Sequence, residues 1–305
     1  MKQTILLIFI CFTSFSSFGQ IYPEDSTMQV IGYWDLNEKQ TYEVTKEKYR
    51  VQHADTTQRE LVKYEVDITI VDSTASSYTI EWVYRHIDQD SENEFEKKLA
   101  GISNNRKVII KTSEMGAFQE VVNWQELRDE IKGATGVVRK EFKHIPKIDL
   151  VIDKVEAMFL TKEAIESMAI KDIQQFYSFH GAVYTLGEEV SGQLQVPNNY
   201  GGEPFNSDAS LILDELNVED NNGVIWMWQT IDSKALTDAT YSFLKESATA
   251  AGNKFPERKD FPSVQSKTTT AARIHGSGWL VYSRETKEVT ADGALAFEER
   301  TIEIK

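Results

Sequence analysis

The segment LVKYEVDITIV, residues 61–71, alternates apolar and polar side chains along its length. Its even-numbered residues are apolar, and positions 63, 65 and 67 are charged. A period of two is that of a β-strand with one buried face. After a short polar turn, SYTIEWVYR at 77–85 repeats the pattern, with Tyr78, Ile80, Trp82 and Tyr84 on one face. The two segments predict a hairpin whose apolar faces are buried in one core.

Strand patterns continue on both sides of this hairpin. Turn signals separate several of them, including Glu114 to Ala117, Asp220 to Gly223 and the Asp-Gly pair at 292–293. The further predicted strands are 41–51, 107–112, 118–122, 182–189, 210–218, 224–231, 265–275, 278–289 and 295–304.

Helical patterns occupy the middle of the chain and one later segment. Asn123, with Glu126 three residues on, has the spacing of a capping box. The region 148–180 is the most helical, and Thr161 is a candidate cap for its second part. Gly181 is suited to close it. Asp232 is a candidate cap for a helix reaching about residue 247.

Runs of strands broken by runs of helix favour an α+β class over a parallel sheet. We expect a β-rich fold of about a dozen antiparallel strands, in a curved half-open barrel or in two packed sheets. The helices of 123–180 and 232–247 would cover its open side. Residues 21–305 are expected to form a single domain. The patterns of about 30–140 and 180–305 also resemble each other, which raises the alternative of a two-fold internal repeat joined by the helical middle.

Residues 1–20 have the pattern of a secretory signal peptide: a basic start at Lys2, an apolar run at 5–12 and small residues before Gln20. The run is shorter than the roughly 20 residues of a membrane span. We expect a mature N-terminus between Gly19 and Tyr22 and export to the periplasm or beyond. Cys11, the one cysteine, lies in this segment after Ile10, a poor lipidation context, so the mature chain has no disulfide.

The chain is acidic, with 33 Lys and Arg against 48 Asp and Glu and a net charge of −15. Loss of Lys2 with the signal peptide makes this −16. Such a balance argues against nucleic acid as a partner, because phosphates require a basic patch. It argues equally against docking on anionic lipid. No later segment resembles a membrane span.

Sequence signatures of catalysis are absent. The chain has no His-Glu-x-x-His pair, no Gly-x-Ser-x-Gly elbow, no phosphate-binding loop and no dinucleotide fingerprint. We therefore expect no catalytic residue, metal or cofactor, and a protein that is not an enzyme. The histidines lack the spacing of metal ligands and are expected to be structural: His53, His86, His144, His180 and His275.

Two acidic features have alternative interpretations. The alternation Asp88, Asp90, Glu92, Glu94, Glu96 is typical of a calcium loop, but Asn93 occupies the place of the required glycine, which favours a solvated loop. In one continuous helix over 162–180, Asp172 would be a desolvated carboxylate, as a general acid needs. We prefer a helix break at which Asp172 is the cap.

Four aromatic residues are the candidate ligand-binding residues. Tyr200 and Phe205 belong to a loop at 197–205 with two glycines and two prolines, a composition found at the rims of ligand sites. Trp226 and Trp228 share one strand face, with Met227 on the other. We expect an apolar pocket between the sheet and the helices of 123–180, with these residues at its rim and wall. The alternative is an ordinary turn and two core tryptophans.

The Gly19-Gln20 end of the signal and the start at Trp34 to Leu36 resemble those of uncharacterised secreted β-rich proteins of Bacteroidota. The order strands, central helices, strands is similar to that of the periplasmic lipoprotein carriers, a resemblance that implies a half-barrel for acyl chains and assigns no residue. We expect a non-catalytic binding or carrier protein for a hydrophobic ligand. The alternatives are a structural or interaction protein of the cell envelope, whose partner is an envelope protein, and a hydrolase with a dispersed site.

Overall fold

The fold is that of a computed structural model. It describes residues 20–52, 55–90, 105–144, 148–157, 159–198, 200–250 and 252–305. Residues 1–19 of the predicted signal peptide, among them Cys11, lie outside the described residues, as do His53 and the acidic residues Glu92, Glu94 and Glu96.

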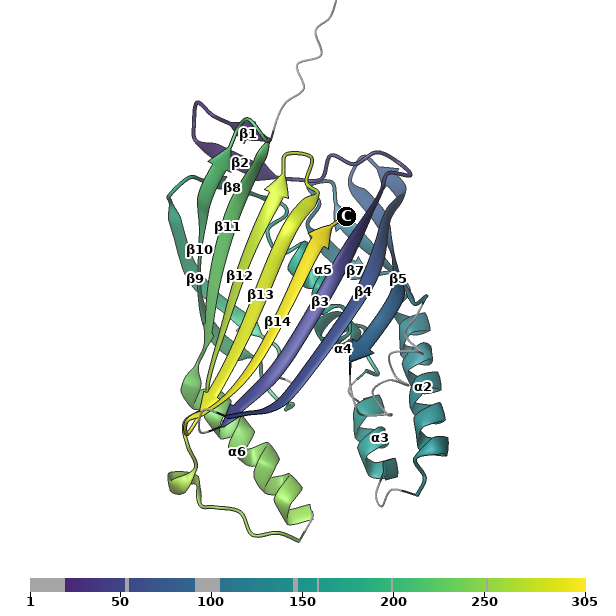
Figure 1. The fold of residues 1–305 in the computed structure, drawn as a ribbon, viewed down its shortest axis with the longest axis vertical. Coiled ribbons are helices and arrows are strands. Elements are labelled where there is room, and N and C mark those ends of the chain that lie inside the picture. The colour runs from purple at the N-terminus through teal and green to yellow at the C-terminus, as the bar shows by residue number, and fades with distance from the viewer. Residues whose placement is uncertain are drawn as a thin grey trace, which may run out of the picture.

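An antiparallel, strongly curved sheet of eleven strands dominates the molecule (Figure 1). Its two edges are β7 and β9, so the sheet is open in the part of the chain that the structure describes. This confirms the predicted β-rich class. In spatial order the strands are β7 (Phe118–Val121), β6 (Lys107–Ser113), β5 (Ser77–Asp90), β4 (Asp55–Thr74), β3 (Lys39–Gln52), β14 (Ala294–Ile304), β13 (Leu280–Ala291), β12 (Gln265–His275), β11 (Asn222–Ile231), β10 (Phe205–Asn217) and β9 (Glu189–Val196).

The hairpin of β4 and β5 has the predicted faces. Its pairing places Val66 opposite Tyr84 and Ile68 opposite Trp82, and all four side chains are buried. Tyr64 is partly buried and packs against the same core. The side of the sheet that bears these residues is the concave one, and we call it the inner face.

A second, three-stranded sheet closes the upper end of the large one in Figure 1. It consists of β1 (Ile21–Tyr22), β2 (Thr27–Val30) and β8 (Ala182–Thr185). We expected one strand over 182–189, but the chain breaks after Thr185, where Gly187 adopts a φ of +75°. The strand that follows, β9, was not predicted, although Val190, Leu194 and Val196 alternate with polar residues along it.

The helical middle consists of α2 (Trp124–Glu141), α3 (Ile148–Ala157), α4 (Lys162–Met168) and α5 (Lys171–Phe176), and α6 (Ser233–Ala250) follows β11. Figure 1 shows α5 behind the large sheet and α2 and α3 beside its β5 to β7 edge. The main core receives buried residues from α5, α4 (Ile165) and α2 (Leu127), and the first turns of α6 contribute Leu236 to a small second core. None of the described helices is both long and apolar enough to cross a membrane.

Two of the predicted helix caps are confirmed. Thr161 accepts a hydrogen bond from the Ala164 amide at 3.2 Å. Asp232 accepts one from the Ala235 amide at 2.6 Å. The Asn123 cap is wrong in its chemistry: the helix begins after Asn123, but its side chain bonds the backbone of Ile109 and Lys107 in β6. Asn123 thus joins the helix to the sheet.

The expected internal repeat stays a prediction. Its two candidate copies lie side by side in the large sheet, because β3 to β7 occupy one half and β9 to β14 the other. They meet where β3 pairs with β14.

Candidate functional site

The upper half of the inner face is a filled apolar core. Phe176 of α5 lies with its ring centroid 5.3 Å from those of both Tyr42 and Trp82, and all three side chains are fully buried. Trp279 and His180 extend the same aromatic cluster. The predicted apolar pocket between this sheet and the helices of 123–180 does not occur here, because α5 fills the space with aromatic rings.

Below the core, Asp172 places a carboxylate in the interior. It accepts hydrogen bonds from the hydroxyls of Tyr84 at 3.0 Å and Tyr64 at 3.2 Å, and its side chain is buried. The predicted break between α4 and α5 is confirmed, but the cap residue of α5 is Ile170, with no side-chain cap bond. Asp172 therefore anchors α5 to β4 and β5 rather than capping it. Burial raises the pKa of both tyrosines well above 10, so they remain hydrogen-bond donors.

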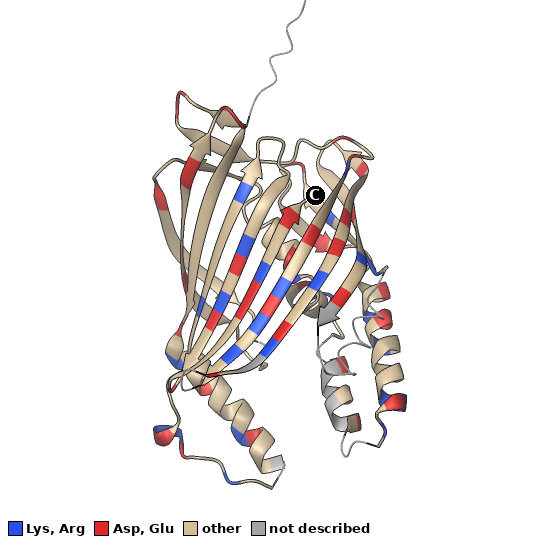
Figure 2. Ribbon diagram, in the orientation of Figure 1, with Lys and Arg blue, Asp and Glu red and all other residues tan. Residues whose placement is uncertain are grey.

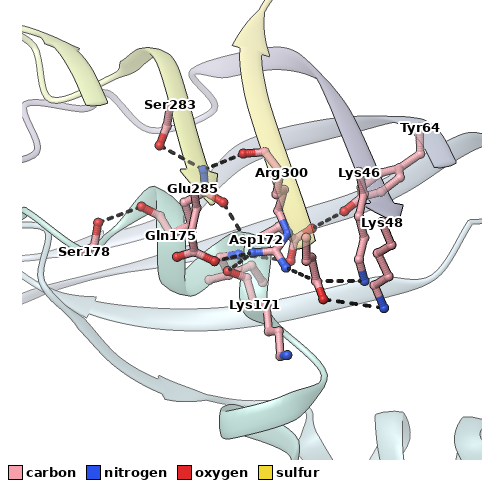
Figure 3. Close-up of polar contacts among 12 residues, drawn as sticks. Lys46, Lys48, Tyr64, Lys171, Asp172, Gln175, Ser178, Ser283, Glu285 and Arg300 are labelled. Carbon is pink, nitrogen blue, oxygen red and sulfur yellow. Dashed lines mark hydrogen bonds and ion pairs between the residues drawn. The ribbon is translucent and has the colours of Figure 1, made fainter. Parts of the chain in front are cut away.

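Gln175 and Arg300 fix the other side of α5 to the sheet (Figure 3). The Gln175 amide donates to the Ser283 hydroxyl at 2.9 Å and to the Arg300 carbonyl at 3.2 Å. The Arg300 guanidinium is almost fully buried and pairs with Glu285 at 3.1 Å and Glu298 at 3.4 Å. The first turn of α5 is thereby held above β13 and β14.

Four lysines surround Glu298 on this part of the inner face, and we call them the lysine cluster: Lys46, Lys48, Lys171 and Lys287. The Glu298 carboxylate lies 3.4 Å from the Lys46 ammonium and 3.6 Å from that of Lys48. Burial alone would raise the pKa of Glu298, but the nearby charges of Lys46, Lys48, Lys171 and Arg300 outweigh it and lower the pKa to about 2. Burial lowers the pKa of Lys46 to about 8 despite Glu298.

The lysine cluster borders an open hollow of about 320 Å³ at the lower end of β3, β13 and β14. The charged residues that line it are Lys48, Arg50, Glu60, Lys287 and Glu298, and Val289 and Ala296 add apolar surface. Below it, Val289 also packs with Phe205 and with Leu236 of α6 in a small second core. The hollow thus lies between the lysines and this second core.

The other half of the inner face is apolar and partly exposed. We call Val190, Leu194, Leu211 and Met227 the apolar strip; the pairing register places them on the inner face of β9, β10 and β11. Val190 is 53% exposed and Leu194 47%, and Leu211 and Met227 are half-buried against the core. Figure 2 shows charged residues on β13, β14, β3 and β4, whereas β11 carries none.

Tyr200 and Phe205 both lie beside α6 instead of the helices of 123–180. Phe205 is the first residue of β10, which begins earlier than predicted, and it is buried against Leu236 and Val264. Tyr200 is 41% exposed, with its ring centroid 5.2 Å from that of Phe243. It lines an open hollow of about 380 Å³ on α6. Phe205 is therefore a core residue, and Tyr200 is the exposed member of the pair.

Trp226 and Trp228 lie on the outer, convex face of β11. Their rings stack at a centroid distance of 6.0 Å and an interplanar angle of 11°. Ile225 and Met227, not the tryptophans, face the core. The expected position of the tryptophans in a pocket wall next to the helices is wrong, because strand alternation places them on the opposite side of the sheet. The four predicted residues do not form one site, and whether any of them binds a ligand stays a prediction.

Neither the lysine cluster nor the apolar strip was predicted, although the sequence contains a signal for both. For the strip, Val190 and Leu194 alternate with polar residues. Lys46 and Lys48 continue the even-numbered positions of Tyr42 and Val44, so charged residues follow apolar ones on one buried face. Glu298 and Arg300 extend the face of Ile302 in the same way. A charge at a position that continues a core face is unusual, since buried charges need partners.

No protein-family model and no curated protein matches this chain. Among solved structures it is similar to one of lipid–protein interactions in lipovitellin. The alignment has 11% identity and a TM-score of 0.37, and it covers 89% of this chain and 25% of that chain. This chain thus spans about a quarter of the length of the lipovitellin chain, and at this TM-score the likeness carries no argument about function.

The described residues contain no cluster of side chains suited to bind a metal ion. No group of three or more His, Cys, Asp or Glu is arranged to hold an ion there. The calcium alternative rested partly on Glu92, Glu94 and Glu96, which lie outside the described residues. Asp88 is exposed at the end of β5.

Proposed function

We propose that this protein is a non-catalytic binding or carrier protein for a hydrophobic ligand, exported to the periplasm or the cell exterior. The observation that carries the proposal is the apolar strip. Val190 and Leu194 expose about half of their surface on the concave side of a sheet, next to the half-buried Leu211 and Met227. Covering an exposed aliphatic side chain contributes roughly 1.5–3 kcal/mol when burial is complete.

The shape of the site supports binding along the strip rather than inside a closed cavity. The core above is filled, and α6 covers only the lower end of the inner face. An extended apolar chain lying across β9, β10 and β11 would contact Val190, Leu211 and Met227, which are direct cross-strand neighbours. Because Met side chains adapt to different shapes, Met227 suits a surface that accepts flexible chains.

The proposal is tested by calorimetric titration of the purified protein with dodecanol and with dodecanoate. We expect saturable binding of at least dodecanoate. Leu194→Asp should weaken it about tenfold or more, because a carboxylate would have to be desolvated against the acyl chain. Ser191→Asp adds the same charge on the outer face of the same strand and is the matched control.

Saturable binding that falls with Leu194→Asp and is unchanged by Ser191→Asp supports the proposal. No saturable binding of either probe, in protein freed of bound lipid by unfolding and refolding, contradicts it. Native mass spectrometry of protein purified from its own host gives a second readout, in which a carried ligand appears as added mass.

A further inference from the structure

The inner face carries a local excess of positive charge in a strongly acidic protein. The four lysines of the lysine cluster and Arg300 are five cations, and the carboxylates that form ion pairs with them are Glu285 and Glu298. Arg50 and Glu60 also line the hollow and add one charge of each sign, and Asp172 accepts two tyrosine hydroxyls. Positive charges therefore outnumber negative charges in this region, whereas the whole chain has a net charge of −15.

Lys171 and Lys287 are the lysines that account for this excess. Neither ammonium group has a carboxylate within ion-pair distance among the described residues, although both side chains are half-buried. Lys171 extends from the first turn of α5, and its ammonium group makes no drawn contact in Figure 3. Lys287 lies in β13, directly opposite Glu298 across the strand pair. Burial lowers the pKa of Lys171, and the neighbouring charges of Lys287, Arg300 and Lys48 lower it further, against the effect of Glu298.

The pairing register connects these lysines to the apolar half of the inner face. One row of cross-strand neighbours runs from Lys48 through Glu298 and Lys287 to Thr268, and continues through Gln229 and Ala209 to Gly192. The adjacent row ends in Met227, Leu211 and Val190. The distance from β13 to β9 is roughly 19 Å along the sheet, since neighbouring strands lie about 4.8 Å apart. Each row is thus charged at one end and neutral or apolar at the other.

We infer that Lys48, Lys171 and Lys287 bind the anionic head group of the ligand, so that the ligand is an amphiphile with a negative head and an apolar chain. The head group occupies the hollow lined by Lys48 and Lys287, and the chain extends across β12 and β11 toward the apolar strip. This rests on the proposed function and specifies its ligand class. An anion in the hollow supplies the counter-charge that Lys171 and Lys287 lack.

The test compares three probes on one protein: dodecanoate, dodecanol and acetate. They share either the apolar chain or the carboxylate, so the contribution of each part is measured separately. The double variant Lys171→Gln/Lys287→Gln removes the two ammonium groups that have no carboxylate partner. Lys267→Gln removes an exposed lysine from the outer face of β12 and is the matched control.

We expect dodecanoate to bind at least about tenfold more tightly than dodecanol, because hydrogen bonds to charged groups contribute that much or more. The double variant should remove this preference while leaving dodecanol affinity unchanged, and Lys267→Gln should preserve it. The double variant should also melt no lower than the parent, because it removes repulsion between like charges. Its folding therefore does not confound the result.

Equal binding of dodecanoate and dodecanol overturns the head-group site but leaves the proposed function standing. A preference for dodecanoate that survives the double variant also overturns it. Acetate binding as tightly as dodecanoate, with the same dependence on the lysines, supports an anion site and contradicts the proposed function. Binding of none of the three probes overturns both.

Discussion

The carboxylate of Asp172 accepts a hydrogen bond from the Tyr84 hydroxyl at 3.0 Å across the interface between α5 and β5. Tyr64 of β4 donates to the other carboxylate oxygen at 3.2 Å. A short helix and two long strands are thus joined by one buried acid. Because α5 also presents Lys171 to the inner face, this contact positions part of the lysine cluster.

Replacing Asp172 with Ala should therefore destabilise the protein by about 2–4 kcal/mol, because two buried tyrosine hydroxyls would lose their acceptor. Tyr84→Phe should cost about 1–2 kcal/mol, since it removes a single donor to a charged group. Urea denaturation measures both. The exposed Asp214→Asn is the control and should stay within about 0.5 kcal/mol of the parent. An Asp172→Ala protein as stable as that control would show that the buried contact contributes little.

Trp82 and Trp228 allow a comparison of the two faces of the sheet. Trp82 is fully buried, whereas Trp228 is half-buried on the outer face. Trp82→Ala should cost about 3–5 kcal/mol, as large aromatic truncations in cores do. Trp228→Ala should cost clearly less in the same denaturation experiment. A Trp82→Ala protein that melts within a degree or two of the parent would contradict the burial of that face.

The sequence predicted the hairpin of β4 and β5 because side-chain alternation can be recognised within each strand, without knowledge of the long-range contacts. It also showed that Trp226 and Trp228 share a face. It did not show which face is inner, because that depends on the pairing of β11 with β10 and β12 and on the direction in which the sheet curves. The tryptophans were therefore assigned to the wrong side.

Long-range pairing explains the other differences. The lysine cluster combines residues from β3, α5 and β13, and no local pattern joins Lys46 to Lys287. The cap assigned to Asn123 failed because β6 offers its side chain better partners than the helix amides do. Thr161 and Asp232 face no such competition, and their caps were predicted correctly.

His180 makes stability depend on pH. Burial lowers the pKa of His180 to about 4, and its hydrogen bond to the Gly278 carbonyl only partly opposes this. The unfolded chain binds a proton near pH 6.5 and the folded one only near pH 4, so the unfolded state holds more protons between these values. Stability should therefore be complete above pH 6.5 and fall as the pH decreases toward 4, by about 3 kcal/mol for this group.

The comparison that isolates this effect is His180→Gln, whose amide can still donate to Gly278. The difference in unfolding free energy between parent and variant, measured by urea denaturation, should change between pH 6.5 and 5, above the range in which most carboxylates titrate. A difference that stays constant over this interval would mean that His180 is protonated as easily in the folded protein as in the unfolded chain.

Gly278 and Gly293 provide the last prediction, which concerns how the small sheet is attached. Both adopt left-handed backbone, with φ of +82° and +72°. A Cβ on Gly278 would overlap the Ile31 carbonyl, whereas a Cβ on Gly293 would meet nothing within 4 Å. Gly293→Ala should cost about 1–2 kcal/mol for its backbone conformation alone. Gly278→Ala should cost more than about 3 kcal/mol, because the overlap adds to that strain. Thermal and urea denaturation of the two variants measure the difference. Equal losses would show that the chain after β2 moves away from the large sheet without penalty, and that the close approach of Ile31 to Gly278 does not hold the upper end together.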